Sequence, residues 1–363
     1  MKQQIFTIQE AVHELEDIIE KHNVQRLLVV HGKKSYTTSH GNELIFHVLR
    51  KHIISVAYFS DFSSNPRNED VQTGADVVRT FKPDAIVAVG GGSAMDVAKL
   101  VRYAAEMPQV PLVAIPTTSG TGAEVTQFAV CYVDGKKESI DHADILPEYS
   151  ILIPALTMAN NRYLTACTGF DALAQAMESY WNIHSTKESE LYAVEAIRML
   201  WDSLNRFSVD PDSCMHDYNW REQMMYGAHL AGEAINITRT TAPHAMSYVL
   251  TSKYGYPHGH GVALTFPYFF EKNIRCTKDE CLVVNYEEYV ARMRSLVQLI
   301  DWSMHDNLFV KMKKFVNILG LGYDAARPYT PIVVERGVNL QRAGNNPMKL
   351  SEQIIKEAVA SIR

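Results

Sequence analysis

The sequence predicts a two-domain α/β protein, with a parallel β-sheet in its first half and helices in its second. Short β-branched runs alternate with amphipathic segments up to about residue 165, and segments with helical periodicity dominate after it. The length of 363 residues exceeds the size at which a single hydrophobic core usually splits. We therefore expect one domain over residues 1–165 and a second, all-α domain over residues 166–363.

The first half contains four runs typical of strands and one clear helix. The expected strands are Arg26–Val30, Ile53–Phe59, Ala85–Val89 and Val110–Ile115. Ala85–Val89 is apolar throughout, as expected when both faces of a sheet are covered. A helix is expected over Asn68–Phe81, with Lys82-Pro83 ending it. Strands that alternate with helices predict βαβ units and hence a parallel sheet.

The second half lacks strand-like runs and has long segments with helical periodicity. The expected helices are Asp171–Asn182, Lys187–Asn205, Asp217–Ala234 and Tyr286–Val297. The change of pattern near Tyr163–Gly169 marks the expected domain boundary.

Composition and charge exclude several classes of protein. Lys and Arg number 35 against 41 Asp and Glu, a net charge of −6, and no basic cluster predicts a nucleic-acid partner. The longest apolar runs, such as Leu27–Val30, are too short to span a membrane, and the first residues lack the apolar core of a signal peptide. The five cysteines show no paired spacing, which favours reduced thiols. We expect a cytoplasmic protein.

Two turns rich in small residues follow neighbouring expected strands. Gly90-Gly91-Gly92-Ser93 joins the third strand to a helix, and residues 116–124 (PTTSGTGAE) follow the fourth strand. Glycines allow close approach of a phosphate, which a helix N-terminus attracts through its free N–H groups and its dipole. The first turn alone could be a structural connection, but two such turns at the carboxyl ends of adjacent strands predict a nucleotide site.

Histidines gather in one stretch of the second half. His244 is followed by His258 and His260, and upstream Asp171 and Gln175 are spaced to share one helix face. Two imidazoles and a carboxylate suit a divalent transition metal with an open position. Each histidine alone is more often structural, and periodicity does not bring Asp171 close to His244.

These motifs resemble the iron-containing (group III) alcohol dehydrogenase family over essentially the whole chain. The matching strings are GGGSAMDVAK (90–99), PTTSGTGAE (116–124), TGFDAL (168–173), and His244 with the later PHG (257–259). The resemblance implies a Rossmann-like dinucleotide-binding domain over residues 1–165 and a helical metal- and substrate-binding domain over residues 166–363. It also implies that the cofactor and the metal lie in the cleft between the two domains.

The resemblance implies a set of cofactor-binding residues for NAD(P)H. Those assigned to the pyrophosphate and its surroundings are glycines and hydroxyl-bearing side chains of the two turns: Gly91, Gly92, Ser93, Thr117, Thr118 and Thr121. Asp96 would lie close to the nicotinamide end, and Lys136 or Lys137 close to its ribose. Ser60 stands where many NAD-preferring relatives have an aspartate, with Asp61 one residue later, so the choice between NADH and NADPH stays open.

The resemblance also implies a divalent ion, Fe²⁺ or Zn²⁺. Asp171, His244 and His258 match three of the family's four ligands, and Gln175 stands where the family has a third histidine. An amide oxygen is a weaker ligand than imidazole, so the site could hold metal less tightly or prefer another ion. Tyr248 stands where many relatives have a histidine near the nicotinamide, which leaves Tyr248, His260 or a water on the metal as the proton relay.

Residues 169–181, 236–244 and 257–264 further resemble phosphonoacetaldehyde reductases, a branch of that family. The implied reaction is NAD(P)H-dependent reduction of a short aldehyde to a primary alcohol, namely phosphonoacetaldehyde to 2-hydroxyethylphosphonate. We expect Arg239 to bind the anionic group of the substrate, because arginine offers a planar fork of donors. A homodimer, common among relatives, is expected.

Three other functions remain open at this point. One is a general iron-containing alcohol dehydrogenase that acts on alcohols without a phosphonate. Another is a lyase like dehydroquinate synthase, which regenerates its cofactor in each turnover. The last is a nucleotide-binding protein that has lost its metal through Gln175.

Overall fold

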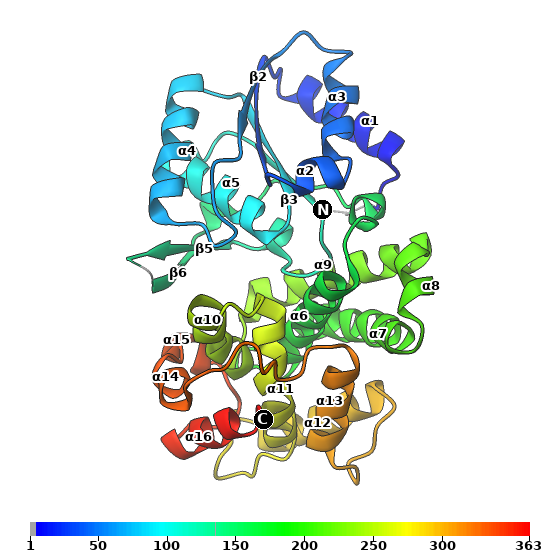
Figure 1. The fold of residues 1–363 in the computed structure, drawn as a ribbon, viewed down its shortest axis with the longest axis vertical. Helices are drawn as coiled ribbons and strands as arrows, with labels where there is room; N and C mark the ends of the chain where they lie inside the picture. Colours follow the sequence, from blue (N-terminus) through cyan, green and yellow to red (C-terminus); the bar gives the residue numbers. More distant parts are fainter. Residues whose placement is uncertain (1–4, 135) are drawn as a thin grey trace. The chain divides into compact units, whose positions relative to one another are not determined.

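The computed structural model describes residues 5–134 and 136–363, and of Lys136 it describes the backbone. The chain forms two compact units (Figure 1). Unit 1 contains Met1–Asn161 and Met215–His229, and unit 2 contains Arg162–Cys214 and Leu230–Arg363. Residues 215–229 thus belong to the unit formed by the start of the chain, although they lie beyond the expected boundary at residue 165.

Unit 1 is built on a parallel five-stranded sheet in the order β2-β1-β3-β4-β7. The strands are β1 (Arg26–His31), β2 (Ser55–Phe59), β3 (Ala85–Gly90), β4 (Leu112–Pro116) and β7 (Tyr149–Ser150). A separate antiparallel hairpin consists of β5 (Phe128–Val133) and β6 (Lys136–Asp141). The helices are α1 (Ile8–Lys21), α2 (Ser35–Thr38), α3 (Gly41–Leu49), α4 (Asn68–Phe81) and α5 (Gly92–Ala104). The parallel sheet with alternating helices confirms the fold class predicted for the first half.

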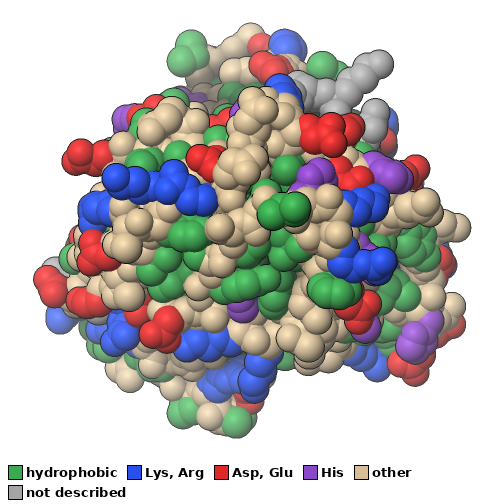
Figure 2. Space-filling model, turned by 90° about the horizontal axis from the view of Figure 1, so that it is seen from above, with side chains coloured by type: hydrophobic (Ala, Val, Ile, Leu, Met, Phe, Trp, Pro, Cys, Tyr) green, Lys and Arg blue, Asp and Glu red, His purple; other side chains and the backbone are tan. Residues whose placement is uncertain are grey.

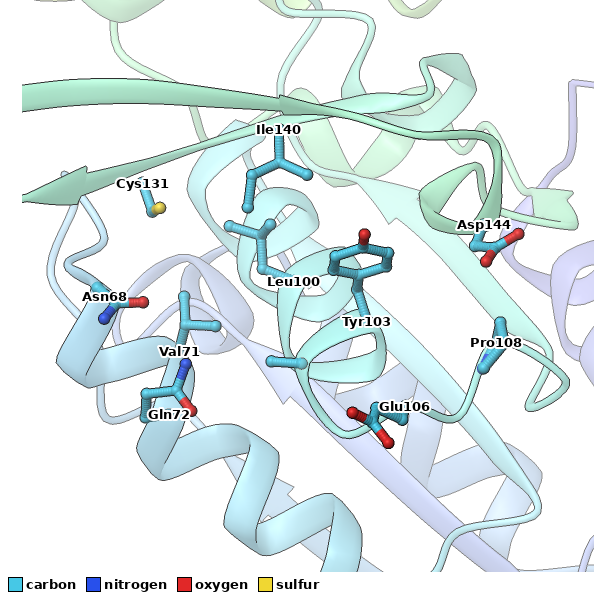
Figure 3. Close-up of a pocket in the computed structure, with 11 residues that line it drawn as sticks. Asn68, Val71, Gln72, Leu100, Tyr103, Glu106, Pro108, Cys131, Ile140 and Asp144 are labelled. Atoms are coloured by element: carbon cyan, nitrogen blue, oxygen red, sulfur yellow. The ribbon is translucent and has the colours of Figure 1, made fainter.

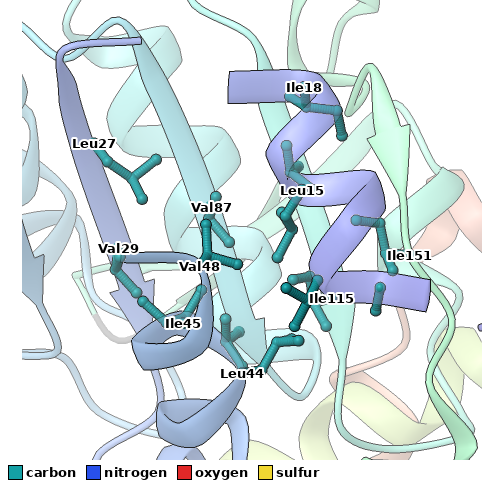
Figure 4. Close-up of a cluster of buried hydrophobic side chains, with 14 of the residues drawn as sticks. Leu15, Ile18, Leu27, Val29, Leu44, Ile45, Val48, Val87, Ile115 and Ile151 are labelled. Atoms are coloured by element: carbon teal, nitrogen blue, oxygen red, sulfur yellow. The ribbon is translucent and has the colours of Figure 1, made fainter. Parts of the chain in front are cut away.

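Helices cover both faces of this sheet because side chains alternate along each strand. Leu27 and Val29 of β1 pack with α1 and α3 on one face (Figure 4). Leu28 and Val30 point to the other face, where they join the cluster formed with α4 and α5. Burial on both faces explains why β1, β3 and β4 are continuous apolar runs.

Unit 2 is helical, as the sequence predicts, and every named strand of the described chain lies in unit 1. Its larger helices are α6 (Arg162–Trp181), α7 (Lys187–Val209), α10 (Ala242–Tyr254), α11 (His258–Ile274), α12 (Tyr286–Leu299), α13 (Leu308–Ile318) and α16 (Glu352–Ala360). The short helices α14 (Pro331–Arg336) and α15 (Leu340–Ala343) belong to the same unit. Helices α8 (Pro211–His216) and α9 (Tyr218–Thr238) each divide between the two units.

The surface carries both signs of charge. Figure 2 shows acidic and basic side chains interspersed on the displayed face. Among the described residues, no helix combines the length and apolar character that a membrane span requires.

Candidate active site

The two turns rich in small residues lie side by side in unit 1. Strands β3 and β4 are parallel neighbours whose ends, Gly90 and Pro116, face each other in register. The backbone N–H of Thr117 donates to the carbonyl oxygen of Gly90 at 2.8 Å. Strand β2 lies on one side of β1, and β3 and β4 follow on the other side. The order in which strands are added to the sheet therefore reverses between β1 and β3. Ligands of open α/β sheets bind at the carboxyl ends of strands at such a switch point.

Close contact between the turns explains the glycines. A Cβ atom on Gly92 would lie 2.9 Å from Cγ2 of Thr121, and one on Gly91 would lie 3.4 Å from Oγ1 of Thr118. Helix α5 begins at Gly92, and no side chain caps its first turn. Its free N–H groups and positive dipole can therefore receive an anion, as a dinucleotide pyrophosphate requires.

The hydroxyls predicted to contact the cofactor have different surroundings. Ser93 donates its hydroxyl to the carbonyl oxygen of Ser64 at 2.5 Å, which leaves its backbone N–H as the group that can face a ligand. Oγ1 of Thr117 is buried and has no hydrogen-bond partner in the part of the chain that the structure describes. The predicted contact from Lys136 concerns a side chain outside the described residues.

Two charged residues of α5 lie next to the turns. Burial raises the pKa of Asp96 to about 6, while Lys99, the N–H of Val130 and Lys137 act in the opposite direction. Lys99 is fully buried and donates to the carbonyl oxygens of Thr126 (2.7 Å) and Phe128 (3.1 Å), and burial lowers its pKa to about 8. Sequence reasoning did not single out Lys99, although it lies three residues after Asp96 in the glycine-rich motif.

An ion pair lies where β2 ends. Lys33 Nζ is 3.0 Å from Asp61 Oδ1, and both side chains are exposed. If the adenosine ribose lies here, Lys33 would offset the negative charge of Asp61, which would otherwise repel the 2′-phosphate of NADPH. This geometry favours neither nicotinamide cofactor.

A separate pocket of about 590 Å³ lies in unit 1 between α4, α5 and the β5–β6 hairpin (Figure 3). Leu100, Tyr103, Cys131 and Asp144 are among the residues that line it, and none of the predicted site residues does. It is therefore distinct from the nucleotide turns.

Unit 2 brings the predicted metal ligands together. The ligand atoms of Asp171 on α6, His244 on α10 and His258 on α11 all lie within 4.8 Å of one another. Asp171 Oδ1 is 3.3 Å from Nε2 of His244 and 3.8 Å from Nε2 of His258. Asp171 and His244 are buried, whereas the His258 side chain is 29% exposed, which gives the cluster one open side.

Gly259 allows these helices to meet. A Cβ atom at this position would lie 2.0 Å from the carbonyl oxygen of Cys167 and 2.9 Å from Cβ of Asp171. Helix α11 therefore approaches α6 through a position without a side chain, directly after His258. The His258 side chain is thereby held next to Asp171.

Gln175 lies one helical turn after Asp171 and is buried. Its Nε2 donates to Asp171 Oδ2 at 3.4 Å, so the amide oxygen is the atom that could serve as a fourth ligand. The donor set is then two oxygens and two nitrogens, which suits a divalent transition metal.

Glu178 belongs to this cluster, although sequence reasoning missed it. It is fully buried and hydrogen-bonds through Oε1 to Nδ1 of His244. Its Oε2 accepts from the N–H (2.6 Å) and the hydroxyl (2.8 Å) of Thr241. The available signal was spacing, because Asp171, Gln175 and Glu178 follow one another along one helix face.

The electrostatics of this pocket favour a cation. Burial by itself would lower the pKa of His244, but Glu178 and Asp171 raise it to about 10. His244 Nε2 is buried and makes no hydrogen bond within the described chain. A metal-ligating imidazole whose other nitrogen is held by a carboxylate is a recurrent arrangement. The residues therefore fit a divalent metal ion.

Of the three residues predicted to act on the substrate, Tyr248 lies close to the metal ligands and His260 is held by hydrogen bonds within the protein. Tyr248 follows His244 by one turn, and its ring centroid is 6.4 Å from that of His258. His260 uses both ring nitrogens, with the hydroxyl of Tyr163 (2.7 Å) and the carbonyl oxygen of Gly322 (2.8 Å), and burial lowers its pKa. That geometry is typical of a structural histidine.

Arg239 lies at the end of α9 in the left-handed conformation, with φ +68°. Its guanidinium donates to the carbonyl oxygens of Ile235 and Asn236 in its own helix. This arrangement stabilises the helix C-terminus and engages donors that sequence reasoning assigned to the substrate.

A glycine-rich turn on a parallel sheet, together with a helical unit in which an aspartate and two histidines converge, fits a metal-dependent class of dehydrogenases. The family model of iron-containing alcohol dehydrogenases matches residues 3–154, and the model of the family's C-terminal domain matches residues 165–320. The chain belongs to the iron-containing alcohol dehydrogenase family, as the motifs predicted.

Similar proteins include aldehyde reductases. The chain is 28% identical to phosphonoacetaldehyde reductase from Streptomyces viridochromogenes over 302 residues, 76% of this chain and 75% of that protein. The crystal structure of sulfoacetaldehyde reductase from Bifidobacterium kashiwanohense in complex with NAD⁺ is 26% identical, with a TM-score of 0.82 over 100% of this chain and 99% of the other.

A third relative is longer. The chain is 28% identical to aldehyde-alcohol dehydrogenase 2 of Entamoeba histolytica over 319 residues, which are 79% of this chain and 36% of that protein. The chain therefore spans about a third of the length of that relative.

Proposed function

We propose that the chain is a metal-dependent NAD(P)H reductase that converts a short anionic aldehyde, such as phosphonoacetaldehyde, into its primary alcohol, 2-hydroxyethylphosphonate. The observation that carries the proposal is the cluster of Asp171, His244 and His258 with Glu178 behind His244. A site with one open side can admit a carbonyl oxygen next to a metal ion.

Asp171, His244 and His258 would hold the ion, with Gln175 as the fourth ligand. A divalent ion there supplies Lewis-acid polarisation of the aldehyde oxygen, and the reduced nicotinamide supplies the hydride. The N–H groups at Gly92 and Ser93 would bind the pyrophosphate of the cofactor.

Of the two proton donors that the sequence predicts, Tyr248 is better placed than His260. It lies one turn beyond His244, and its ring centroid is 6.4 Å from that of His258, whose side chain is 29% exposed. As hydride reaches the carbonyl carbon, its hydroxyl would deliver a proton to the oxygen. His260 is less suited because both of its ring nitrogens are engaged.

Two similar proteins support the anionic substrate, since they are named for the reduction of phosphonoacetaldehyde and of sulfoacetaldehyde. Both names describe short aldehydes with an anionic group. That shared chemistry supports an anionic aldehyde as the substrate to test.

A panel of aldehydes tests the proposal. The purified protein, loaded with Fe²⁺ or Zn²⁺ or treated with chelator, is assayed with NADH and NADPH on phosphonoacetaldehyde and on propionaldehyde. We expect stoichiometric nicotinamide oxidation that depends on metal and is faster with phosphonoacetaldehyde. Equal activity on both aldehydes contradicts the anionic preference, and no turnover with any metal contradicts the reductase assignment.

A further inference from the structure

We propose that Lys99, a buried lysine of α5, is a positioning residue that holds the two turns of the nucleotide site in the arrangement that NAD(P)H requires. The inference rests on the proposed function for the identity of the cofactor. It concerns a buried charge that has no part in the proposed reaction.

Lys99 is a cation without contact with solvent. Its side chain is fully buried, and burial of an ammonium group is unfavourable unless polar groups accept its hydrogens. Its Nζ donates to the carbonyl oxygens of Thr126 at 2.7 Å and Phe128 at 3.1 Å, and to the Thr126 hydroxyl at 3.2 Å. These acceptors match the three donors of an ammonium group. Lys99 therefore fixes the backbone at Thr126 and Phe128.

The backbone that Lys99 fixes continues the second turn of the nucleotide site. That turn (116–124) leads into the 3₁₀ helix η1 (Ala123–Val125), and Thr126 follows directly. The turn is anchored at its start because Pro116 ends β4 within the sheet. It is anchored at its far end by the contacts of Thr126 with Lys99.

Lys99 also belongs to the helix that carries the first turn. Helix α5 begins at Gly92, about two helical turns before Lys99, so the lysine shares a rigid element with the N–H groups proposed to bind the pyrophosphate. The two turns are in close contact, since a Cβ atom on Gly92 would lie 2.9 Å from Cγ2 of Thr121. A shift of the second turn would therefore change the space available to the cofactor. One side chain thus links the two turns.

The charge of Lys99 suits a fixed donor rather than a proton relay. Burial lowers its pKa to about 8, while Asp96 and Glu124 act in the opposite direction and Arg102 assists burial. Most of the lysine is therefore charged at pH 7. Its three hydrogens are engaged with Thr126 and Phe128, so the ammonium group is held in place rather than turned to a ligand.

Titration with NADH and with NADPH, followed by nicotinamide fluorescence, tests this role without any aldehyde. In Lys99→Met, the acceptors at Thr126 and Phe128 lose their donor. We expect Kd for the preferred cofactor to rise about 3- to 30-fold, the range for a residue that acts through its neighbours. Affinity for Zn²⁺, whose proposed ligands belong to unit 2, should change by about twofold or less. In turnover of phosphonoacetaldehyde, KM for the cofactor should rise with Kd while kcat changes little.

Arg102→Met is the matched control. Arg102 is also fully buried on α5, about one turn after Lys99, and it donates to the carbonyl oxygens of Asp144 (2.7 Å) and Leu146 (2.9 Å). It lies near the end of α5 that is remote from Gly92. Loss of this cation should lower Tm, as loss of Lys99 does, and leave Kd for the cofactor unchanged. The comparison separates lost stability from lost positioning.

A milder pair of variants covers the case in which Lys99→Met does not fold. Thr126→Val preserves the shape of the side chain and removes one of the three acceptors, whereas Thr126→Ser keeps the hydroxyl. We expect Kd for the cofactor to rise about 2- to 10-fold in Thr126→Val, as for loss of one hydrogen bond, and to stay at the wild-type value in Thr126→Ser.

The inference and the proposed function fail on different results. A wild-type protein that binds NADH or NADPH but reduces no aldehyde refutes only the proposed reduction, and its Kd still tests Lys99. The inference is overturned if folded Lys99→Met or Thr126→Val binds the cofactor as tightly as the wild-type protein does. It is also overturned if Arg102→Met weakens binding equally, or if the wild-type protein binds neither cofactor.

Discussion

Replacing Glu178 with glutamine tests whether a buried carboxylate positions the metal-binding histidine. Glu178 accepts three hydrogen bonds, one from His244 Nδ1 and two from Thr241. A carboxamide has one acceptor oxygen and one donor NH₂ group, so it cannot satisfy three donors in this arrangement. The substitution preserves volume, removes the charge and replaces one acceptor oxygen by a donor NH₂ group.

Either orientation of the new amide disturbs the site. If its oxygen faces Thr241, its NH₂ group faces Nδ1 of His244 and places the imidazole proton on Nε2, the atom that turns to Asp171. If its oxygen faces His244, its NH₂ group opposes the N–H of Thr241. Loss of such a supporting carboxylate typically lowers metal affinity 10- to 100-fold, and an unsatisfied buried donor costs about 1–3 kcal/mol.

Competition with a chelator of known affinity measures the loss for Zn²⁺ and Fe²⁺, and thermal unfolding of the metal-free protein measures stability. Glu190→Gln is the matched control, since Glu190 lies on α7 of the same unit and pairs with Arg292 at 2.8 Å. The metal affinity of the Glu190→Gln variant should equal that of the wild-type protein. Wild-type metal affinity in a folded Glu178→Gln variant would refute the positioning role.

Three further substitutions test other parts of the site. Gln175→His should bind Fe²⁺ and Zn²⁺ more tightly, because imidazole replaces an amide oxygen; unchanged retention after dialysis would show that residue 175 is no ligand. Gly259→Ala should lower both metal affinity and Tm, because its Cβ would lie 2.0 Å from the carbonyl oxygen of Cys167, whereas Gly261→Ala, with its nearest contact at 3.4 Å, should be tolerated. Burial raises the pKa of Asp96 to about 6, so the folded protein holds this proton more tightly than the unfolded chain and loses up to about 3 kcal/mol as pH rises from about 4 to 6. The Tm advantage of Asp96→Asn over wild type should therefore be larger at pH 7 than at pH 4.5, and a pH-independent difference would contradict the raised pKa.

The fold of unit 1 could be predicted because its signals are local. Strand β3 is apolar along its whole length and ends in glycines, and α4 has the bounds expected from its periodicity and its Lys82-Pro83 stop. Helix α6 was harder to predict. It begins at Arg162, well before the expected Asp171. Nearly all its residues from Thr165 onward are buried, so the sequence lacks the alternation of polar and apolar faces by which a helix start is predicted.

The metal cluster could be predicted only in part. Asp171 and Gln175 share a helix face by spacing, but the approach of α10 and α11 to α6 depends on packing at Gly259, which no periodicity reveals. The resemblance to a family supplied that juxtaposition. Arg239 could not be judged from sequence, since its left-handed backbone and its contacts with its own helix appear only in three dimensions.

Charge in unit 2 explains why the substrate's anion would need a dedicated cation. Asp171 and Glu178 are two buried carboxyl groups, whose negative charge a divalent ion would offset. A neutral aldehyde can then bind without further charge compensation, but a phosphonate adds negative charge to a protein whose net charge is already −6. The overall field cannot attract such a ligand, so the attraction has to be local.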